Sequence, residues 1–252
     1  MHGAFIRGSM CCSDSVDTES SFMNADLNDI RRDFPRLDAA TVAAAAGYAS
    51  SILADVAGRR GAMDGRIQAL VPAMRVCGPA FTVEVRPGDN LMIHAAMAMA
   101  RPGDVLVIDG KADRSAALMG SIMLTACKAL GLAGVVLDAS LRDTEELREL
   151  GFPVWSIGAN PNGPTKGVSG RINWPVCCGG VTVHPGDLIV GDADGVVVVE
   201  REKAASLLPL AMKKVADERQ RIADITGGGA IRPKWLEAAL VAAGVLKAGE
   251  PL

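Results

Sequence analysis

Short apolar runs alternate with polar turns through the middle of the chain, and this alternation predicts its main elements. Residues 105–108 and 135–137 are continuous apolar runs, typical of strands buried on both faces. Between them, residues 119–130 predict a helix that Gly131 ends. The polar stretch 109–119 is interpreted as the loop between the first strand and this helix. A strand, a helix and a second strand within about 30 residues predict parallel neighbours joined by a right-handed crossover.

The same interpretation extends to both sides of this unit and predicts an α/β fold. Upstream it predicts a helix over 39–56, a strand over 75–85 and a helix over 91–100. Downstream it predicts a helix over 144–150, a strand over 153–157, a loop-rich segment over 158–180, strands over 188–190 and 196–199, a long helix over 201–225 and a terminal helix over 233–245.

Composition narrows the class of protein. The 252 residues are 49% hydrophobic and only 4% aromatic, which suits one α/β domain with a core of small aliphatic side chains. We expect a flexible, Ser-rich tail over 1–24, the domain over 25–205 and a C-terminal helical extension over 206–252. The net charge of −3 argues against binding to nucleic acid or to an anionic membrane.

Cysteine usage and hydropathy indicate a compartment. The six cysteines form no C-x-x-C motif, and only three histidines accompany them, so a zinc site of standard spacing is not expected. Reduced, mostly buried thiols in a cytoplasmic protein are the simplest interpretation. No apolar run reaches the roughly 18 residues of a membrane span, and the N-terminus lacks the apolar core of a secretory signal.

Candidate chemistry lies where the two central strands end. Ligands of parallel sheets bind at the carboxyl ends of the strands, so Gly120, Ser121, Ile122 and Met123 can face Arg142–Asp143 there. A helix start offers free amides and partial positive charge to an anion. Arg142 can clamp a carboxylate, and Asp143 is a hard oxygen ligand for Mg²⁺ or Mn²⁺.

A purely structural role for Arg142–Asp143 remains open on spacing alone, and spacing alone favours it. Asp143-x-x-Glu146 is a plausible capping pattern at the start of a solvated helix. A glycine near a helix start, such as Gly120, is also common. The facing arrangement of the two segments, and not either segment by itself, indicates a reaction site.

Other polar residues receive simpler interpretations. His94, within an Ala- and Met-rich helix, is interpreted as a core or interface histidine, and His184 as an exposed turn residue. Asp192 and Asp194 fit turn formation before Gly195. Asp113 and Arg114 lie in the expected loop before Gly120 and are secondary candidates for contact with a ligand, and Cys177–Cys178 are expected to pack rather than react.

Several segments together resemble the RraA-like family, which includes 4-hydroxy-4-methyl-2-oxoglutarate aldolase/oxaloacetate decarboxylase enzymes and the regulator of ribonuclease E activity A. They are RVCGPAFTVEVRPGDNLMIHAAMAMARPGDVLVIDG, MGSIMLTACKALGLAGVVLDASLRD and CGGVTVHPGDLIVGDADGVVVVE, in collinear order over about residues 35–205. The resemblance implies a compact α/β fold related to swivelling phosphohistidine domains. It also implies trimers or hexamers with sites near subunit boundaries.

The resemblance further implies a class II pyruvate aldolase that depends on a divalent metal, Mg²⁺ or Mn²⁺. By this resemblance the backbone of Gly120, Ser121, Ile122 and Met123, together with Arg142, would bind the pyruvoyl part of a small 2-oxo acid, and Asp143 would hold the metal. Oxaloacetate decarboxylation would share the same enolate. The alternative is a non-enzymatic regulator that binds ribonuclease E or another protein.

Two departures from the family pattern stand out. Ser121 occupies the place where the aldolases usually carry an acidic residue, and residues 138–143 read DASLRD instead of D-G-x-x-R-D. A methyltransferase acting on a quinone precursor, a third label in this family, lacks support because no glycine-rich nucleotide loop follows the first strand.

Overall fold

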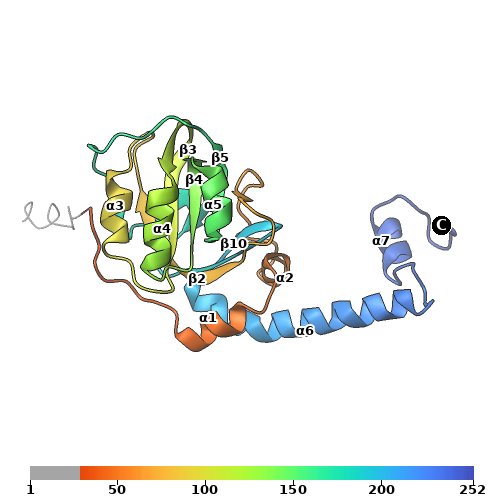
Figure 1. Ribbon diagram of the computed structural model, residues 1–252. Helices are drawn as coiled ribbons and strands as arrows, with labels where there is room; N and C mark the ends of the chain where they lie inside the picture. The colour runs from red at the N-terminus through yellow and green to blue at the C-terminus, as the bar shows by residue number, and fades with distance from the viewer. Residues whose placement is uncertain (1–28) are drawn as a thin grey trace, which may run out of the picture.

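The protein is a mixed α/β structure in which a twisted central sheet carries helices; the computed structural model describes residues 29–252 (Figure 1). The expected tail over 1–24 therefore lies outside the described residues. Four parallel strands form the centre of the sheet in the order β5 (Val154–Ala159), β4 (Gly134–Leu141), β3 (Val105–Met119) and β2 (Val76–Glu84). This confirms the parallel βαβ unit predicted from residues 105–137.

Strand β3 is much longer than its apolar run, so the predicted loop over 109–119 is wrong. After Ile108 the chain keeps pairing with β4 through Asp113–Ala139, Ala117–Ser140 and Met119–Leu141, with register shifts between these pairs. Apolar periodicity does not detect this extension, because residues 111–115 are mostly exposed and carry no apolar alternation. Left-handed backbone at Lys111 and Ala112 (φ 59° and 55°) accompanies the irregularity.

Antiparallel strands extend the sheet at both edges. Strands β9 (Leu188–Asp192) and β10 (Gly195–Val199) follow β2, and β1 (Gln68–Ala69) pairs with β5. Within the segment expected to be loop-rich, β6 (Arg171–Ile172) pairs with β2, and β7 (Val176–Cys178) pairs with β8 (Val181–Val183).

Helices α3 (Leu91–Met97), α4 (Ser121–Ala129) and α5 (Thr144–Leu150) lie together against one face of the sheet (Figure 1). Their buried side chains join the main core, in which Leu124, Cys127 and Leu147 pack with the apolar strand residues. The start of α4 is thereby placed directly beyond the end of β3 and next to the end of β4.

The single helix predicted over 39–56 is two helices, α1 (Ala39–Ala45) and α2 (Ser50–Val56), bent by 107°. Ala49 is extended (ψ 152°), and buried Asp192 caps α2 by accepting from the Ser50 amide at 2.8 Å. The alanine-rich composition hid this break. Both helices pack with β9, β10 and helix α6 (Arg201–Thr226) in a second, smaller apolar cluster.

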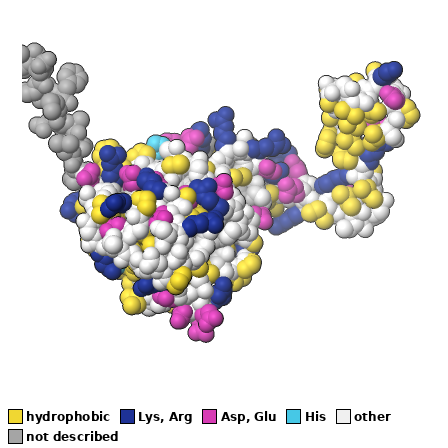
Figure 2. Space-filling model, turned by 90° about the horizontal axis from the view of Figure 1, so that it is seen from above, with side chains coloured by type: hydrophobic (Ala, Val, Ile, Leu, Met, Phe, Trp, Pro, Cys, Tyr) yellow, Lys and Arg dark blue, Asp and Glu magenta, His cyan; other side chains and the backbone are white. Residues whose placement is uncertain are grey.

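A helical arm leaves the body beside α1. Helix α6 (Arg201–Thr226) buries only Ala204 and Ala211 and carries α7 (Leu236–Ala242) away from the sheet (Figure 1). The expected boundary at 205/206 thus falls within α6. Hydrophobic side chains gather at the far end of the arm (Figure 2), among them exposed Ile231, Trp235 and Val245.

None of the individual helices in residues 29–252 combines the length and the hydropathy of a membrane span. The bent pair α1 and α2 passes that test only when its two helices are taken together.

Candidate functional site

The ends of β3 and β4 bring the predicted glycine and arginine segments into contact. Met119 and Leu141 pair at the last register position of the two strands, and the Arg142 amide donates to the Met119 carbonyl at 3.0 Å. Gly120 follows Met119 as the N-cap of α4, and Asp143 follows Arg142 as the N-cap of α5. The two helix starts therefore lie side by side at one edge of the sheet.

Asp143 occupies the N-cap position of α5, but its side chain caps the neighbouring helix α4. Its side chain makes no cap hydrogen bond to α5, which corrects the capping-pattern interpretation. Instead its Oδ2 accepts from the Ser121 amide at 2.9 Å and from the Ser121 hydroxyl at 3.0 Å. Asp143 also has left-handed backbone (φ 60°), which costs a non-glycine residue about 1–2 kcal/mol. The local backbone therefore directs this carboxylate toward α4.

Gly120 is required by close packing and not by its backbone angle, which is extended (φ −150°). A Cβ at this position would lie 2.4 Å from Asp143 Oδ2 and 3.0 Å from Arg142 Cγ. Any side chain here would push the carboxylate off the start of α4. The glycine thus allows the two segments to share one small volume.

The Arg142 guanidinium is available to a ligand. Among the described residues its one ion pair is to Asp143, with Nε 3.9 Å from Oδ1, longer than a normal hydrogen bond. Its side chain is 43% exposed. A Cβ on Gly163 would come within 3.0 Å of Nη1, so the 163–166 loop approaches the same group.

These residues line a cavity of about 170 Å³. Gly120, Ile122, Met123, Arg142 and Asp143 all contribute to its wall, whereas Ser121 does not. The amide of Ser121 is already bonded to Asp143, and that of Leu124 to the Gly120 carbonyl. The first-turn amides of Ile122 and Met123 remain for a ligand, since first-turn amides have no partner within their helix.

Three polar residues of the cavity were not identified from the sequence: Asn90, His94 and Lys166. Of the two interpretations of His94, the core residue is wrong, because this side chain is exposed and lines the cavity, and the interface residue stays a prediction. A signal existed, since Asn90 and His94 are four residues apart and therefore share a helix face. Lys166 lies in an irregular loop, where no sequence pattern indicates a site residue.

Asn90 presents an unsatisfied acceptor beside the cavity. Its side chain is 2% exposed, and its Nδ2 donates to the Leu118 carbonyl at 2.8 Å, which fixes the orientation of the amide. Its Oδ1 has no hydrogen-bond partner among the described residues. An unpaired buried acceptor costs about 1–3 kcal/mol, so this atom favours a ligand that brings a donor.

The loop that carries Lys166 is held in place by Asp89. Oδ2 of this buried carboxylate accepts from the Thr165 hydroxyl at 2.7 Å and from the Gly167 amide at 2.7 Å, and Oδ1 caps α3 through the Leu91 amide at 2.9 Å. Burial opposes ionisation, but the hydrogen bonds outweigh it and lower the pKa of Asp89 below its usual range. The loop is thus anchored to a charged group.

The donor set suits a loosely held divalent cation and not a closed metal cage. Residues 29–252 contain no group of three or more His, Cys, Asp or Glu side chains placed to hold a metal. Asp143 nevertheless offers Oδ1, which no Ser121 group occupies, on a carboxylate that is 34% exposed. Mg²⁺ commonly binds through one or two carboxylates and keeps several waters.

The secondary candidates lie elsewhere. Asp113 bonds to Ser115, and neither it nor Arg114 lines the cavity. Asp192 accepts from the Asp194 amide at 3.0 Å, which confirms its turn role, and His184 is exposed as expected. Cys178 is buried, and desolvation raises its pKa well above the ordinary value, while Cys177 is exposed.

The sequence of this chain is similar to those of known proteins. The family model described as RraA-like: Aldolase/RraA matches residues 25–198. A Halalkalibacterium halodurans protein, provisionally named 4-hydroxy-4-methyl-2-oxoglutarate aldolase, is 46% identical over 147 residues, which cover 58% of this chain and 70% of the relative.

Solved structures share the fold. Streptomyces coelicolor RraAS2, described as an unusual member of the RNase ES inhibitor RraA protein family, superposes with a TM-score of 0.70 and is 29% identical, over 75% of this chain and 98% of the other. A Geobacillus kaustophilus structure named as an S-adenosylmethionine: 2-dimethylmenaquinone methyltransferase gives a TM-score of 0.57 at 31% identity, over 60% of this chain and 94% of the other.

Proposed function

The chain belongs to the RraA-like family, and from this membership and the geometry of the cavity we propose that it is a divalent-metal-dependent class II pyruvate aldolase. The substrate is a 4-hydroxy-2-oxo acid such as 4-hydroxy-4-methyl-2-oxoglutarate, and pyruvate is one product. Oxaloacetate is decarboxylated at the same site, because both reactions pass through the enolate of pyruvate. The H. halodurans relative, by its provisional name, supports this substrate class.

One observation carries the proposal: a half-exposed guanidinium, a helix start and a carboxylate share one small cavity. The Arg142 side chain would bind the carboxylate and the 2-oxo oxygen of the substrate. The amides of Ile122 and Met123 would bind the same pyruvoyl group from the start of α4. Negative charge that develops on the 2-oxo oxygen during carbon–carbon cleavage is stabilised by these fixed donors.

Asp143 would hold the divalent cation, with water completing its coordination. When bound, such a cation supplies Lewis-acid polarisation of the 2-oxo group. The Ser121 hydroxyl and amide orient the carboxylate from one side. This leaves Asp143 Oδ1 on the side of Arg142, where a substrate carboxylate would also bind.

The test is an assay for pyruvate release from oxaloacetate and from 4-hydroxy-4-methyl-2-oxoglutarate, with Mg²⁺, Mn²⁺ or EDTA. We expect release that requires metal. Pyruvate release that persists unchanged in EDTA would contradict the metal requirement, and no release from either substrate would contradict the aldolase proposal.

The second candidate is a non-enzymatic regulator that binds a ribonuclease or another protein. The similarity to Streptomyces coelicolor RraAS2, whose description names an RNase ES inhibitor family, favours it. The exposed Arg142 guanidinium and the unpartnered Asn90 oxygen, which line one cavity, favour the enzyme instead. The pyruvate assay therefore separates the two functions.

We also propose that the chain forms a homo-oligomer, a trimer or a hexamer, with the arm as part of the interface. Helix α6 leaves the apolar side chains of Leu210, Met212 and Ile222 exposed, and a neighbouring subunit would cover them. Sedimentation of the full chain measures the state directly. A monomer at micromolar concentration would contradict it.

A further inference from the structure

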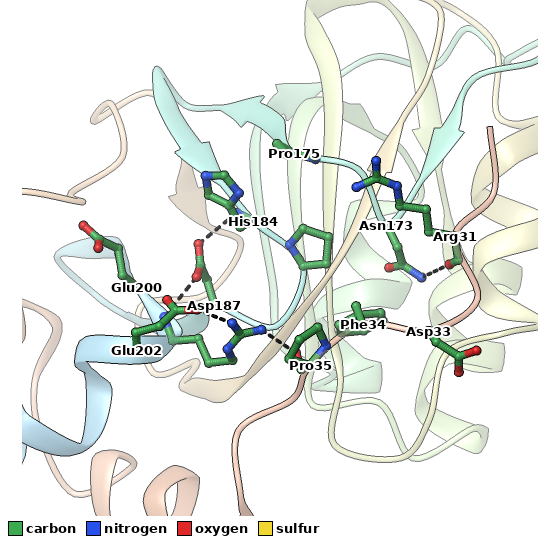
Figure 3. A pocket seen from close by; sticks show the side chains of 12 residues that line it. Arg31, Asp33, Phe34, Pro35, Asn173, Pro175, His184, Asp187, Glu200 and Glu202 are labelled. Carbon is green, nitrogen blue, oxygen red and sulfur yellow. Dashed lines mark hydrogen bonds and ion pairs between the residues drawn. The ribbon is translucent and has the colours of Figure 1, made fainter. Parts of the chain in front are cut away.

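A second cavity lies at the start of α6 and shares no lining residue with the candidate site. Its volume is about 450 Å³, and Figure 3 shows the side chains around it. The segment before α1, the connection between β6 and β7, the turn after β8 and the first residues of α6 meet here. We propose that this cavity binds a small organic cation, a primary ammonium or guanidinium group on a short apolar chain.

The first observation is an acceptor with no donor. Asn173 is fully buried, and its Nδ2 donates to the Arg31 carbonyl at 2.8 Å. A flipped amide would place two oxygens against each other, so this bond fixes the orientation of the side chain. Its Oδ1 has no hydrogen-bond partner among the described residues, and Figure 3 shows it turned away from Arg31. A ligand must therefore bring a donor to this position.

The second observation is the balance of charge. Four carboxylates (Asp33, Asp187, Glu200 and Glu202) and two guanidiniums (Arg31 and Arg201) line the cavity. Arg31 stacks on Trp174 with its Cζ 3.3 Å from the ring centroid. Arg201 bonds to Glu202 and to the Pro35 carbonyl, and Lys203 bonds to Glu200 at 2.7 Å. Among the described residues, Asp33 and Asp187 are therefore the lining carboxylates that no Lys or Arg side chain pairs with. The cavity thus favours a cation.

Asp187 is the anionic group set deepest in this wall, with 3% of its surface exposed. Its oxygens accept from the His184 amide at 2.8 Å and from the Arg201 amide at 3.0 Å (Figure 3 shows this residue beside His184). A carboxylate has about four lone-pair sites, so two remain for a ligand. Burial raises the pKa of Asp187, an effect that a bound cation would offset.

The remaining lining residues of the cavity favour an organic cation over a metal ion. Phe34, Pro35, Pro175 and Pro185 supply flat apolar surface, which suits a carbon chain and does nothing for a metal ion. Within residues 29–252 no three His, Cys, Asp or Glu side chains converge closely enough to hold a metal. The combination of an amide oxygen, a buried carboxylate and apolar rings is the chemistry that recognises an alkyl ammonium or alkyl guanidinium.

The experiment is calorimetric titration of the full chain with butylamine and butylguanidine, with butanol as the neutral probe. We expect saturable binding of both cations at one site per chain and none of butanol. Asp187→Asn should weaken binding about tenfold, because it removes a charge-assisted hydrogen bond. Glu202→Gln, at an exposed position that does not threaten folding, should weaken it about twofold through loss of a more distant charge.

Asp192→Asn is the matched control, since Asp192 is equally buried and also caps a helix through a backbone amide, that of Ser50. Its binding should equal that of the unaltered chain. Equal binding of butanol, no saturable binding of either cation up to about 10 mM, or unchanged binding in both the Asp187 and Glu202 variants would overturn the proposal. If Asp187→Asn does not fold, Glu202→Gln decides alone.

Discussion

Two aspartates five residues apart, Asp138 within β4 and Asp143 just after it, show how a structural carboxylate differs from an available one. Asp138 is buried and accepts from Arg66 Nε at 3.2 Å, from Arg66 Nη2 at 2.9 Å and from the Gly179 amide at 2.9 Å. Asp143 is 34% exposed, and in the part of the chain that the structure describes its side-chain hydrogen bonds are those of Oδ2 with Ser121. Both oxygens of the first carboxylate accept hydrogen bonds, whereas Oδ1 of the second accepts none among the described residues.

Their arginines differ in the same way. The Arg66 guanidinium is held by a bidentate pair, and the side-chain hydrogen bond with Asp138 raises its pKa. Within residues 29–252, the one ion pair of Arg142 is that to Asp143, at 3.9 Å. A charged group that is fully paired in the folded protein has little left for a ligand. We therefore expect substitutions at Arg66 to change stability, and substitutions at Arg142 to change chemistry.

Arg142→Ala should give the largest effect on catalysis. Loss of the clamp should cost about 3 kcal/mol of transition-state stabilisation, a drop in kcat/KM of about 100-fold. The free energy of unfolding in urea should change by less than about 0.5 kcal/mol, because the Arg142 side chain is exposed and weakly paired. Steady-state pyruvate release and equilibrium unfolding measure the two quantities, and a large loss of stability would contradict the comparison.

Arg66→Ala should lower the stability of the fold and leave catalysis unchanged. Removing one partner of a buried pair typically costs 3–5 kcal/mol, and the partial exposure of Arg66 reduces the expected loss of stability to about 2 kcal/mol. Pyruvate release per folded molecule should be unchanged. A catalytic defect in folded protein would show that the Asp138 pair belongs to the site.

Asp89→Asn extends the comparison to a third carboxylate. It should lower the free energy of unfolding by about 1 kcal/mol, because the side chain that holds the 163–168 loop loses its charge. The Gly167 and Val168 amides should exchange hydrogen faster. Because the folded pKa of Asp89 is lowered, its contribution is present above the unfolded value near 3.8 and is lost as pH falls through the folded pKa. If neither the substitution nor acid pH changes the protection of these two amides from hydrogen exchange, the proposed role of Asp89 is wrong.

Ser121→Ala should have the smallest effect, about 0.5 kcal/mol in stability, because the backbone amide still holds Asp143. Ser121→Asp is the informative partner, since it restores the acidic residue usual in the family's aldolases beside an existing carboxylate. It should raise the apparent metal affinity in a Mg²⁺ titration of pyruvate release. A variant with lower metal affinity would show that Ser121 suits this chain better.

Periodicity and strand ends predicted the parallel βαβ unit, and with it the meeting of Gly120 with Arg142. They could not predict the extension of β3 past Ile108, because its pairing depends on the facing β4 and not on local hydropathy. They also misassigned the cap, since a carboxylate that bonds across to another helix leaves the same sequence pattern as one that caps its own.

The polar residues of the cavity wall could not be predicted from the sequence either. Asn90 and His94 enter it because α3 packs beside the end of β3, and Lys166 enters because Asp89 pins its loop. These are long-range contacts, which no short window of sequence contains.

The most direct measurement is titration of the full chain with oxalate, a planar mimic of the pyruvate enolate, in the presence of Mg²⁺. Our account predicts one site per chain, loss of binding in Arg142→Ala and retention of binding in Arg66→Ala. Oxalate binding that is unchanged in Arg142→Ala, or that is lost equally in Arg66→Ala, would contradict the claim that the start of α4 and the end of β4 form the reaction site.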